Sequence, residues 1–387
     1  MLTTLELRPS FGFGDRLGLA TPGHIAAVKG TNFAPIFAQQ SVRENARTRR
    51  TPQQVMDDAL RAVEAAGWDA PWGADADHLK TVADMKSFVD AGFTFFTVDP
   101  GDHVDNAADI DSIQILREKT AAQKWEERSS IYLASANEQP WGVFNEERLL
   151  RAIAKYGKAI DHTIMMYQQL KEMKDSFDFE ASVDETEAPT TPLEHYFIVN
   201  ELTRAGVNFT SLAPRFIGRF EKGVDYIGDL DALDIELAKH AAVTKHFSTY
   251  KLSLHSGSDK FSVYPLIAKH WGKLLHVKTA GTSYLEALRT LAVKEPALFG
   301  RIWKMSLEKY PAERATYHVS GELDKVQAGL APADLLNDFH ARQILHVTFG
   351  SALILFGNEI HGRLKKHADA YTENLQIHFA KHLDLLK

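Results

Sequence analysis

The sequence predicts an α/β fold and, within that class, a closed (β/α)8 barrel of the TIM type. Short apolar segments alternate with longer segments in which apolar residues recur every three or four positions. Such an alternation of strands and helices builds a parallel sheet. About eight strand–helix units follow one another, which favours a barrel over an open doubly wound sheet. The 387 residues are enough for one barrel with additional segments.

Nine segments have the length and the apolar or β-branched composition of a buried strand. This is one more than a (β/α)8 barrel needs, so the open doubly wound sheet remains the alternative. In chain order the predicted strands span residues 9–15, 35–41, 71–77, 93–99, 177–185, 208–216, 249–257 and 274–280, and residues 315–321 are the ninth candidate.

Amphipathic helices are predicted between these strands. The clearest examples are residues 51–67, 78–92 and 191–206, each of which ends at a glycine. They have the length and the apolar periodicity of helices that cover a parallel sheet.

Two other stretches are helical without the regular alternation with strands. We interpret residues from about 105 to 175 as a helical insertion after the fourth strand, and residues from about 322 to 387 as a helical tail. Both are expected to belong to a single barrel domain that spans residues 1–387.

The composition limits the class of protein. Cysteine is absent, which excludes disulfides and thiolate ligands, so any metal must be held by His, Asp or Glu. The net charge of -7, without a long basic run, argues against nucleic acid or a membrane surface as a partner. The N-terminal residues do not resemble a signal peptide, and no apolar run reaches about 18 residues. We therefore expect a cytoplasmic protein, and a homo-oligomer is compatible with this composition.

Ionisable side chains gather at the predicted carboxyl ends of the strands, where (β/α)8 barrels carry their chemistry. The fourth strand, FTFFTVD, leads directly into PGDH, so that two acids and a histidine follow within a tight turn. At least six consecutive strand ends carry such groups, where one polar residue is usual. In chain order they are Asp75, Asp77, His78, Asp99, Asp102, His103, Asp184, Glu185, Glu187, Arg215, His255, Asp259, Lys260, His276 and Lys278.

Histidines that share a barrel mouth indicate a divalent metal site. Neutral imidazole binds Zn, Mn, Ni or Fe(II) and leaves coordination positions open for substrate oxygens. A single histidine at such a place is more often a hydrogen-bonded core or loop residue, and no HExxH or HxH spacing strengthens the assignment. We predict His103, His255 and His276 as the ligands, with His318 as the reserve.

Two acids are candidates for proton transfer. Asp102, next to His103, is able to orient a metal-bound imidazole or to act as a general acid or base, and its alternative role is that of a turn-forming residue. Glu185 forms an acidic pair with Glu187, for which a solvated loop or a helix cap is the alternative.

Basic residues at the same predicted mouth indicate the kind of substrate. Arg215, Lys260 and Lys278 suit a carboxylate, and with them we group Asp259 as a substrate-binding residue. Each basic residue alone is more often part of a structural ion pair. Together they indicate an anionic, polyhydroxylated small molecule. The glycines of GFGDRLG do not have dinucleotide-binding spacing and HSGSDKF lacks the phosphate-loop pattern, so no nucleotide cofactor is expected.

The motifs together resemble the tagaturonate/fructuronate epimerase family from about residue 9 to the tail. The resemblance rests on GFGDRLG, FTVDPGDHVD, SVDETEAPTTPLEH, LAPRFIGRFEKGVDYIGD, LHSGSDKFSVYP and HVKTAGTSYLEALR. It implies a barrel enzyme that uses a divalent metal and interconverts D-tagaturonate and D-fructuronate by inversion at carbon 4.

The pair Asp102-His103 also resembles that of metal-dependent class II aldolases, which implies a proton-transfer role for Asp102 and a ligand role for His103. The loop LHSGSDK is likewise similar to an aldolase ligand loop, which implies that His255 is a ligand. The third ligand is then His276 or His318.

The implied reaction agrees with these residue types. Carbon 4 is not adjacent to the ketone, so a base alone cannot invert it. The inversion requires either transient oxidation by a nicotinamide or retro-aldol cleavage between carbons 3 and 4, and the sequence favours cleavage because it has no dinucleotide fingerprint. Glu185 would be the second acid. The alternatives are a metal-dependent aldolase or ketose isomerase acting on a related sugar or sugar acid, and a non-catalytic sugar-acid sensor.

Overall fold

Eight parallel strands form a closed barrel in which each strand pairs with its neighbour in sequence and β8 pairs with β1. The computed structural model describes residues 1–121, 123, 125–134 and 138–387. The predicted (β/α)8 fold and its eight strand positions are confirmed. The strands are β1 Ser10–Phe13, β2 Ala34–Ser41, β3 Gly73–Leu79, β4 Phe95–Val98, β5 Asp178–Ser182, β6 Ser211–Ala213, β7 Lys251–Leu254 and β8 Leu275–Thr279.

The ninth strand candidate, residues 315–321, is wrong. The segment begins within a 3-10 turn, Arg314–Thr316, and continues as extended backbone outside the sheet. The physical reason is the closure of the barrel: β8 already pairs with β1 along Ser10–Phe13, so no sheet edge is left for another strand.

Helices alternate with the strands, and several begin at strong sequence signals. The predicted helices appear as α3 (Pro52–Ala65), α4 (Val82–Asp90) and α8 (Pro192–Arg204), each opened by a threonine capping box. Helix α4 begins later than predicted because β3 continues to Leu79. The other helices between strands are α1 Thr21–Val28, α2 Val42–Thr48, α9 Leu230–Phe247 and α10 Tyr264–Trp271, and α11 Thr282–Lys294 follows β8.

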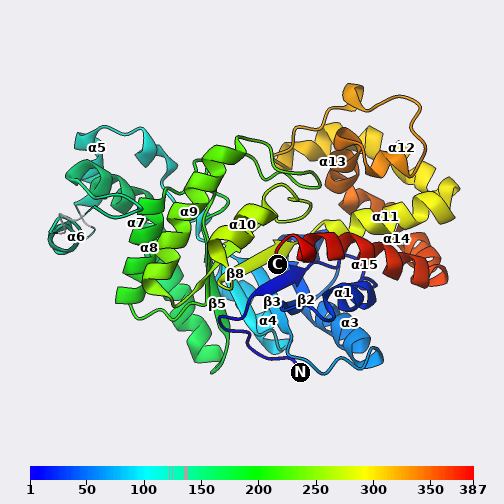
Figure 1. Ribbon diagram of the computed structural model, residues 1–387, viewed down its shortest axis with the longest axis horizontal. Helices are drawn as coiled ribbons and strands as arrows, with labels where there is room; N and C mark the ends of the chain where they lie inside the picture. Colours follow the sequence, from blue (N-terminus) through cyan, green and yellow to red (C-terminus); the bar gives the residue numbers. More distant parts are fainter. Residues whose placement is uncertain (122, 124, 135–137) are drawn as a thin grey trace.

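Three α-helices lie between β4 and β5 in the described part of the chain: α5 (Ile113–Thr120), α6 (Trp125–Tyr132) and α7 (Glu146–Met173). Helix α7 has 28 residues and packs against α4 and α8, so it takes the place of a barrel helix in the outer ring. Helix α5 packs on the outer side of α7, and these helices project at the upper left in Figure 1. The segment 105–175 therefore includes a helix of the ring as well as helices added to it.

The last four helices are α12 (Pro296–Glu313), α13 (Phe339–Val347), α14 (Phe349–Lys366) and α15 (Ala368–Asp384). Helix α15 runs back across the barrel and packs against α1 and α11, whereas α12 and α13 pack together at the upper right in Figure 1. Helix α15 thus completes the helical ring, and α13 lies near the carboxyl end of β8.

The barrel interior is polar, although (β/α)8 barrels usually fill this space with branched apolar residues. Leu5, Ile36 and Phe95 form a small apolar cluster of their own. The other inward-facing positions include charged and imidazole side chains that are shielded from water. Burying them is costly unless each is paired, so these positions must form one connected network. Inward-facing members of it are Ser10, Asp75, Thr97, Glu180, Lys251, His276 and Lys278.

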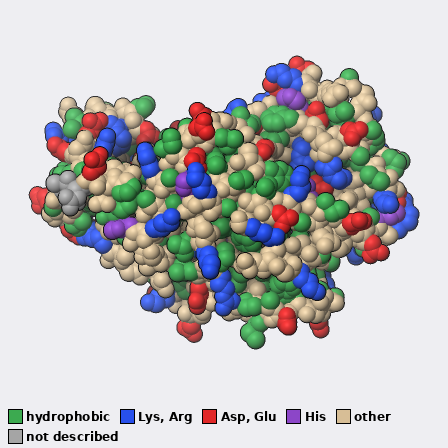
Figure 2. Space-filling model, in the orientation of Figure 1, with side chains coloured by type: hydrophobic (Ala, Val, Ile, Leu, Met, Phe, Trp, Pro, Cys, Tyr) green, Lys and Arg blue, Asp and Glu red, His purple; other side chains and the backbone are tan. Residues whose placement is uncertain are grey.

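The face shown in Figure 2 gives no sign of a strongly charged interface. Acidic and basic side chains are interspersed over the face shown in Figure 2, without a large patch of one sign. Among the described residues, no helix has the length and apolar character needed to cross a membrane.

Candidate active site

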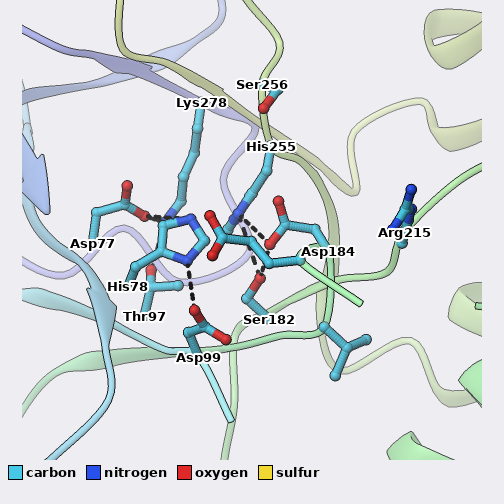
Figure 3. A network of polar contacts seen from close by, with 12 residues as sticks. Asp77, His78, Thr97, Asp99, Ser182, Asp184, Arg215, His255, Ser256 and Lys278 are labelled. Carbon is cyan, nitrogen blue, oxygen red and sulfur yellow. Dashed lines mark hydrogen bonds and ion pairs between the residues drawn. The ribbon is translucent and has the colours of Figure 1, made fainter. Parts of the chain in front are cut away.

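Charged side chains from five strands converge at the carboxyl end of the barrel (Figure 3). β3 contributes Asp77 and His78, and β8 contributes Lys278. Asp99, Asp184 and His255 follow directly or closely after β4, β5 and β7. Because all strands are parallel, their carboxyl ends meet on the same side of the sheet, and residues far apart in sequence come within hydrogen-bonding distance.

Lys278 is the buried cation of this network. Its Nζ lies 2.7 Å from Asp75 Oδ2, 2.8 Å from Asp77 Oδ1 and 2.9 Å from Glu180 Oε1. Burial lowers the pKa of Lys278, but the three carboxylates outweigh that effect and hold it well above its usual value. Burial, opposed by Lys278, raises the pKa of Asp75 to about 7. Lys278 therefore remains charged and keeps several acids together.

Two imidazoles lie beside this cation, with ring centres 5.0 Å apart. His255 Nε2 is 2.6 Å from Glu180 Oε1, and its Nδ1 is 3.2 Å from Asp184 Oδ1. Burial lowers the pKa of His255, but Asp184 and Glu180 raise it to about 9 overall.

The second imidazole, His78, faces two other acids. Its Nδ1 is 3.4 Å from Asp99 Oδ2, and its Nε2 is 3.9 Å from Asp77 Oδ1. Burial lowers the pKa of His78, but Asp77 and the hydrogen bond with Asp99 raise it to about 10 overall. Positive charge is therefore strongly stabilised where the two rings meet.

Backbone strain coincides with this site. His78 has φ 51° and Ser256, the residue after His255, also has φ 51°. A residue with a Cβ in this left-handed region costs roughly 1–2 kcal/mol, and such residues cluster at functional sites. The strained conformations direct the ends of β3 and β7 toward the mouth of the barrel.

The donors at the centre fit a divalent cation. One ligand atom each from Asp77, His78 and His255 lie within 4.8 Å of one another. A divalent cation would supply the positive charge that protons on the two imidazoles otherwise provide, and it would displace those protons. Four acids around this point have a pKa held below its usual value, so their negative charge exceeds the single positive charge of the Lys278 ammonium. They are Asp77, Asp99, Glu180 and Asp184.

A second group of comparable residues, Asp259, His378 and His382, does not offer the same chemistry. His382 Nε2 accepts a hydrogen bond from the backbone N–H of Asp259, and its Nδ1 donates to the carbonyl of His378. Both of its nitrogens are thus held by backbone groups of the fold, whereas the nitrogens of His255 face carboxylates, which a bound cation can replace. This group fastens α15 to the loop after β7.

Three of the residues predicted from the sequence meet at this site. His255 and Lys278 lie at its centre. Glu185 lies at the rim, where one of its oxygens is within 4.8 Å of donor atoms of His78 and Asp99. Its other contact is an ion pair of 2.8 Å with the exposed Arg43.

His103 and Asp102 do not join His255. The turn Gly101–His103 carries both outward, so that the Asp102 side chain is 71% exposed and pairs with Lys80 at 2.9 Å. His103 is exposed and stacks on His162 of α7, with ring centres 4.0 Å apart. Asp99, three residues before Asp102, is the acid of this segment that faces the mouth.

The two candidates for the third imidazole also lie elsewhere. His276 is fully buried deeper in the barrel, where its Nδ1 is 2.9 Å from Ser10 Oγ. His318 is exposed. The predicted trio His103, His255 and His276 is therefore not assembled in this structure. His276 faces inward two residues before Lys278 in β8, so its ring lies deeper in the barrel than the mouth, and His103 lies in the outward turn after β4.

The remaining predicted substrate-binding residues have structural contacts. Asp259 pairs with Arg342 at 2.8 Å and with His378 at 2.5 Å. Lys260 is fully buried and donates to the carbonyls of Glu221, Val224 and Ser258, which uses all three of its N–H groups. Arg215 is half-buried and lies beyond Asp184 in Figure 3, apart from the imidazoles.

The roles of several central residues were missed in the sequence, although a signal for them exists. In GADADHL and DFEAS, polar residues alternate with Ala or Phe at a period of two, which places every acid on one face of the strand. Barrel strands with apolar outer faces and acidic inner faces indicate a polar interior. This signal indicates Asp178 and Glu180, which the strand-end rule did not name, and it also gives a role in the interior to Asp75 and Asp77, which that rule named only as strand-end acids.

A small cavity occupies the mouth, with a volume of about 30 Å³. Ligand clefts usually measure several hundred Å³, so the walls must move apart to admit a six-carbon sugar acid. The lining residues are Gln39, Asp77, His78, Lys222, Gly223, His255, Ser256, Ser258, Lys278, Ala280, Gly281 and His346.

A (β/α)8 barrel with paired acids, imidazoles and a lysine around a cavity at the carboxyl ends of its strands is an enzyme of small-molecule metabolism. Comparison with known proteins defines the enzyme further. The chain belongs to the tagaturonate epimerase family, whose model matches residues 3–386. It is therefore an epimerase, a member of the isomerase class.

Two relatives support this assignment over nearly the whole chain. The tagaturonate/fructuronate epimerase of Thermotoga maritima is 46% identical over 98% of this chain and 81% of its own. The native crystal structure of the fructuronate-tagaturonate epimerase UxaE from Cohnella laeviribosi is 38% identical, with a TM-score of 0.94 over 100% of this chain and 83% of that one. A glycerol complex of that epimerase matches with the same TM-score of 0.94.

Proposed function

We propose that this protein interconverts D-tagaturonate and D-fructuronate by inversion at carbon 4, with the help of a divalent metal. Carbon atoms are counted from the hydroxymethyl end, so the ketone is carbon 2 and the carboxylate is carbon 6. The family and the names of the relatives support the reaction. The observation that carries the proposal is the convergence of Asp77, His78 and His255 on one point at the barrel mouth.

Asp77, His78 and His255 would hold the metal, and Zn, Mn and Ni all suit a site of two imidazoles and one carboxylate. When bound, the metal supplies Lewis-acid polarisation of the substrate ketone. Asp99 orients the His78 ring, and Glu180, which faces Nε2, orients the His255 ring, so that Nδ1 of His255, beside Asp184, would be the nitrogen left for the metal. Fixed orientation of this kind is what supporting carboxylates provide to ligating imidazoles.

Retro-aldol cleavage followed by aldol addition accounts for inversion at a carbon that carries no acidic hydrogen. A base takes the proton of the carbon-4 hydroxyl, and carbon 4 becomes an aldehyde as the bond to carbon 3 breaks. The bonding pair passes toward the ketone oxygen and gives an enediolate of carbons 1–3. The aldehyde turns to present its other face, and carbon 3 adds to it. The aldehyde oxygen becomes an alkoxide at carbon 4 and takes up a proton.

Glu185 and Asp184 are the acids we assign to these proton transfers. Glu185 lies at the rim, where its ion pair with the exposed Arg43 leaves it room to move. Asp184 lies deeper beside His255 and accepts a hydrogen bond of 2.5 Å from Ser182. The two carboxylates are adjacent in sequence but differ in depth, so they can serve different faces of the aldehyde. Asp102, which is exposed and paired with Lys80, has no part in this assignment.

Metal-stripped protein incubated with D-fructuronate and followed by proton NMR tests the proposal. We expect no change before metal is added, and formation of tagaturonate after addition of Zn, Mn or Ni without NAD. Accumulation of three-carbon fragments would instead define an aldolase. Full activity after metal removal, or none with any of the metals, would contradict the proposed function.

The retro-aldol route also predicts the fate of the hydrogen at carbon 4. That C–H bond stays intact during cleavage and addition, so substrate deuterated at carbon 4 should show no primary kinetic isotope effect. Product formed in D2O should likewise carry no solvent deuterium at carbon 3 or carbon 4. A primary isotope effect with the deuterated substrate would indicate oxidation at carbon 4, because hydride removal breaks that bond.

A further inference from the structure

The mouth cavity has a second wall, opposite in character to the acidic one. It consists of Lys222 in the loop between β6 and α9, Gly281 at the start of α11, and His346 of α13. We call these three residues the basic wall. None of them belongs to the cluster of acids and imidazoles described above, and two come from parts of the chain outside the predicted strand ends.

His346 is the most unusual member of the basic wall. It is 1% exposed, and neither ring nitrogen has a hydrogen-bond partner in the described part of the chain. Burial lowers the pKa of His346 well below its usual value, so the ring is neutral and offers one donor and one acceptor. Buried polar groups in proteins are nearly always satisfied, and one that is not requires an explanation, such as a role in catalysis or a bound water or ion.

Gly281 makes room for this ring. A Cβ at position 281 would overlap His346 Cε1 and Nδ1. The glycine has φ -96°, which any residue can adopt, so the requirement at this position is one of space. The imidazole is thus held directly against the first turn of α11.

Helix α11 begins at this point and adds its own positive end. It has 13 residues, and no side chain caps its N-terminus. The hydroxyl of Thr282, its first residue, is buried and has no partner among the described residues. Free N–H groups and the helix dipole at such an end attract anions. The unpartnered His346 beside it provides an independent sign of a ligand.

Lys222 completes the wall, and its loop is firmly held. Its Nζ donates to Ser256 Oγ at 2.6 Å, and no carboxylate of the described residues lies within ion-pair distance of it. On either side of Lys222, Arg342 Nε donates to the carbonyl of Gly223 at 2.6 Å and Gln343 Nε2 donates to Glu221 Oε2 at 2.8 Å. Helix α13 therefore both carries His346 and fixes the loop of Lys222.

We infer that Lys222, His346 and the N-terminus of α11 bind the carboxylate of the hexuronate and so orient the sugar across the mouth. The ketone end then faces Asp77, His78 and His255. This inference rests on the proposed function, and it assigns the selectivity for sugar acids over neutral ketohexoses to the basic wall. Each contact is a charge-assisted or dipole-assisted hydrogen bond to a carboxylate, the kind that contributes most to recognition.

Comparing D-fructuronate with D-fructose tests this assignment, because the two sugars differ only at carbon 6. Calorimetric Kd values and kcat/KM are measured for both sugars. In Lys222→Gln, we expect the preference for D-fructuronate over D-fructose to fall about 10- to 100-fold, the usual value of a hydrogen bond to a charged group. Lys245→Gln, at an exposed lysine of α9, is the matched control and should keep the preference.

Two more variants examine the imidazole. His346→Leu removes both ring nitrogens, and Gly281→Ala displaces the ring without changing it. Both should reduce the preference for the sugar acid in the same direction as Lys222→Gln. Circular dichroism and thermal unfolding identify any variant that fails to fold. If His346→Leu or Gly281→Ala fails to fold, Lys222→Gln, at a half-buried position, still tests the assignment.

The outcomes separate this inference from the proposed function. Equal losses for both sugars in all three variants would overturn the carboxylate assignment while leaving the epimerase intact. If the unaltered enzyme binds D-fructuronate without converting it, the proposed function fails. A selective loss of D-fructuronate binding in Lys222→Gln would then still support the basic wall. Failure of the unaltered, metal-loaded enzyme to bind D-fructuronate would overturn both.

Discussion

His255→Ala should remove the bound metal and reduce kcat/KM for D-fructuronate by about a thousandfold or more. The substitution deletes one of the three proposed ligands and leaves Glu180 and Asp184 without their imidazole partner. Losing the metal removes the Lewis acid that stabilises charge at the ketone oxygen, an effect of several kcal/mol, and each 1.4 kcal/mol corresponds to about a factor of ten in rate.

Metal content measured by mass spectrometry after dialysis, together with kcat/KM, checks this prediction. His270→Ala is the matched control, because His270 is a partly buried histidine that pairs with Asp234 away from the mouth. We expect it to keep metal and activity. His103→Ala distinguishes the two ligand sets, because His255 belongs to both. Loss of metal from His103→Ala would favour the ligands predicted from sequence, and retention would favour those assigned here.

Lys278→Met should lower the free energy of unfolding by about 3–5 kcal/mol, the cost of removing one partner from a buried ionic network. Methionine nearly matches lysine in length, so little cavity is created. What remains is a group of acids, Asp75, Asp77 and Glu180, without the ammonium that now lies within 3 Å of each. Their mutual repulsion in a shielded interior is the physical source of the loss.

Urea unfolding of the metal-free variants measures this effect. Lys269→Met is the control, since Lys269 forms an exposed ion pair with Asp234, and such pairs contribute about 1 kcal/mol or less. The double variant Lys278→Met/Asp77→Asn should recover part of the loss, because the pKa of Asp77 is held below its usual value and its ionised carboxylate is one of the repelling charges. A loss no larger than that of Lys269→Met, or no recovery in the double variant, would show that the network is not held by Lys278.

The barrel was predictable because its signals are local. Each strand is a short apolar segment, and helices such as α3 and α8 open with a threonine and a proline that satisfy or tolerate the free N–H groups of the first turn. The ninth strand candidate fails for a reason that no local pattern contains. Whether residues 315–321 can pair depends on whether β1 and β8 have already closed the sheet.

The candidate site was predictable in position but only partly in its members. The rule that barrel chemistry lies at strand carboxyl ends assigned roles to His255, Lys278 and Glu185, and it named other members of the site only as ionisable strand ends: Asp75, Asp77, His78, Asp99 and Asp184. It did not distinguish Asp99 from Asp102, because the turn at Pro100 and Gly101 decides which acid points inward. It also grouped His276 with the mouth, although this ring lies one inward-facing position deeper than Lys278.

The sequence by itself determined the alternation of strands and helices that favours a barrel, the family resemblance and the end of the barrel at which the chemistry lies. The first and the last follow from periodicity and composition within single segments, and the resemblance rests on the motifs quoted above. Only the tertiary structure decided that His78 faces His255 and that His346, from a helix near the C-terminus, closes the opposite wall. The physical reason is that side-chain direction at a strand end changes face with each residue, and contacts between distant segments arise only when the closed sheet brings their ends together.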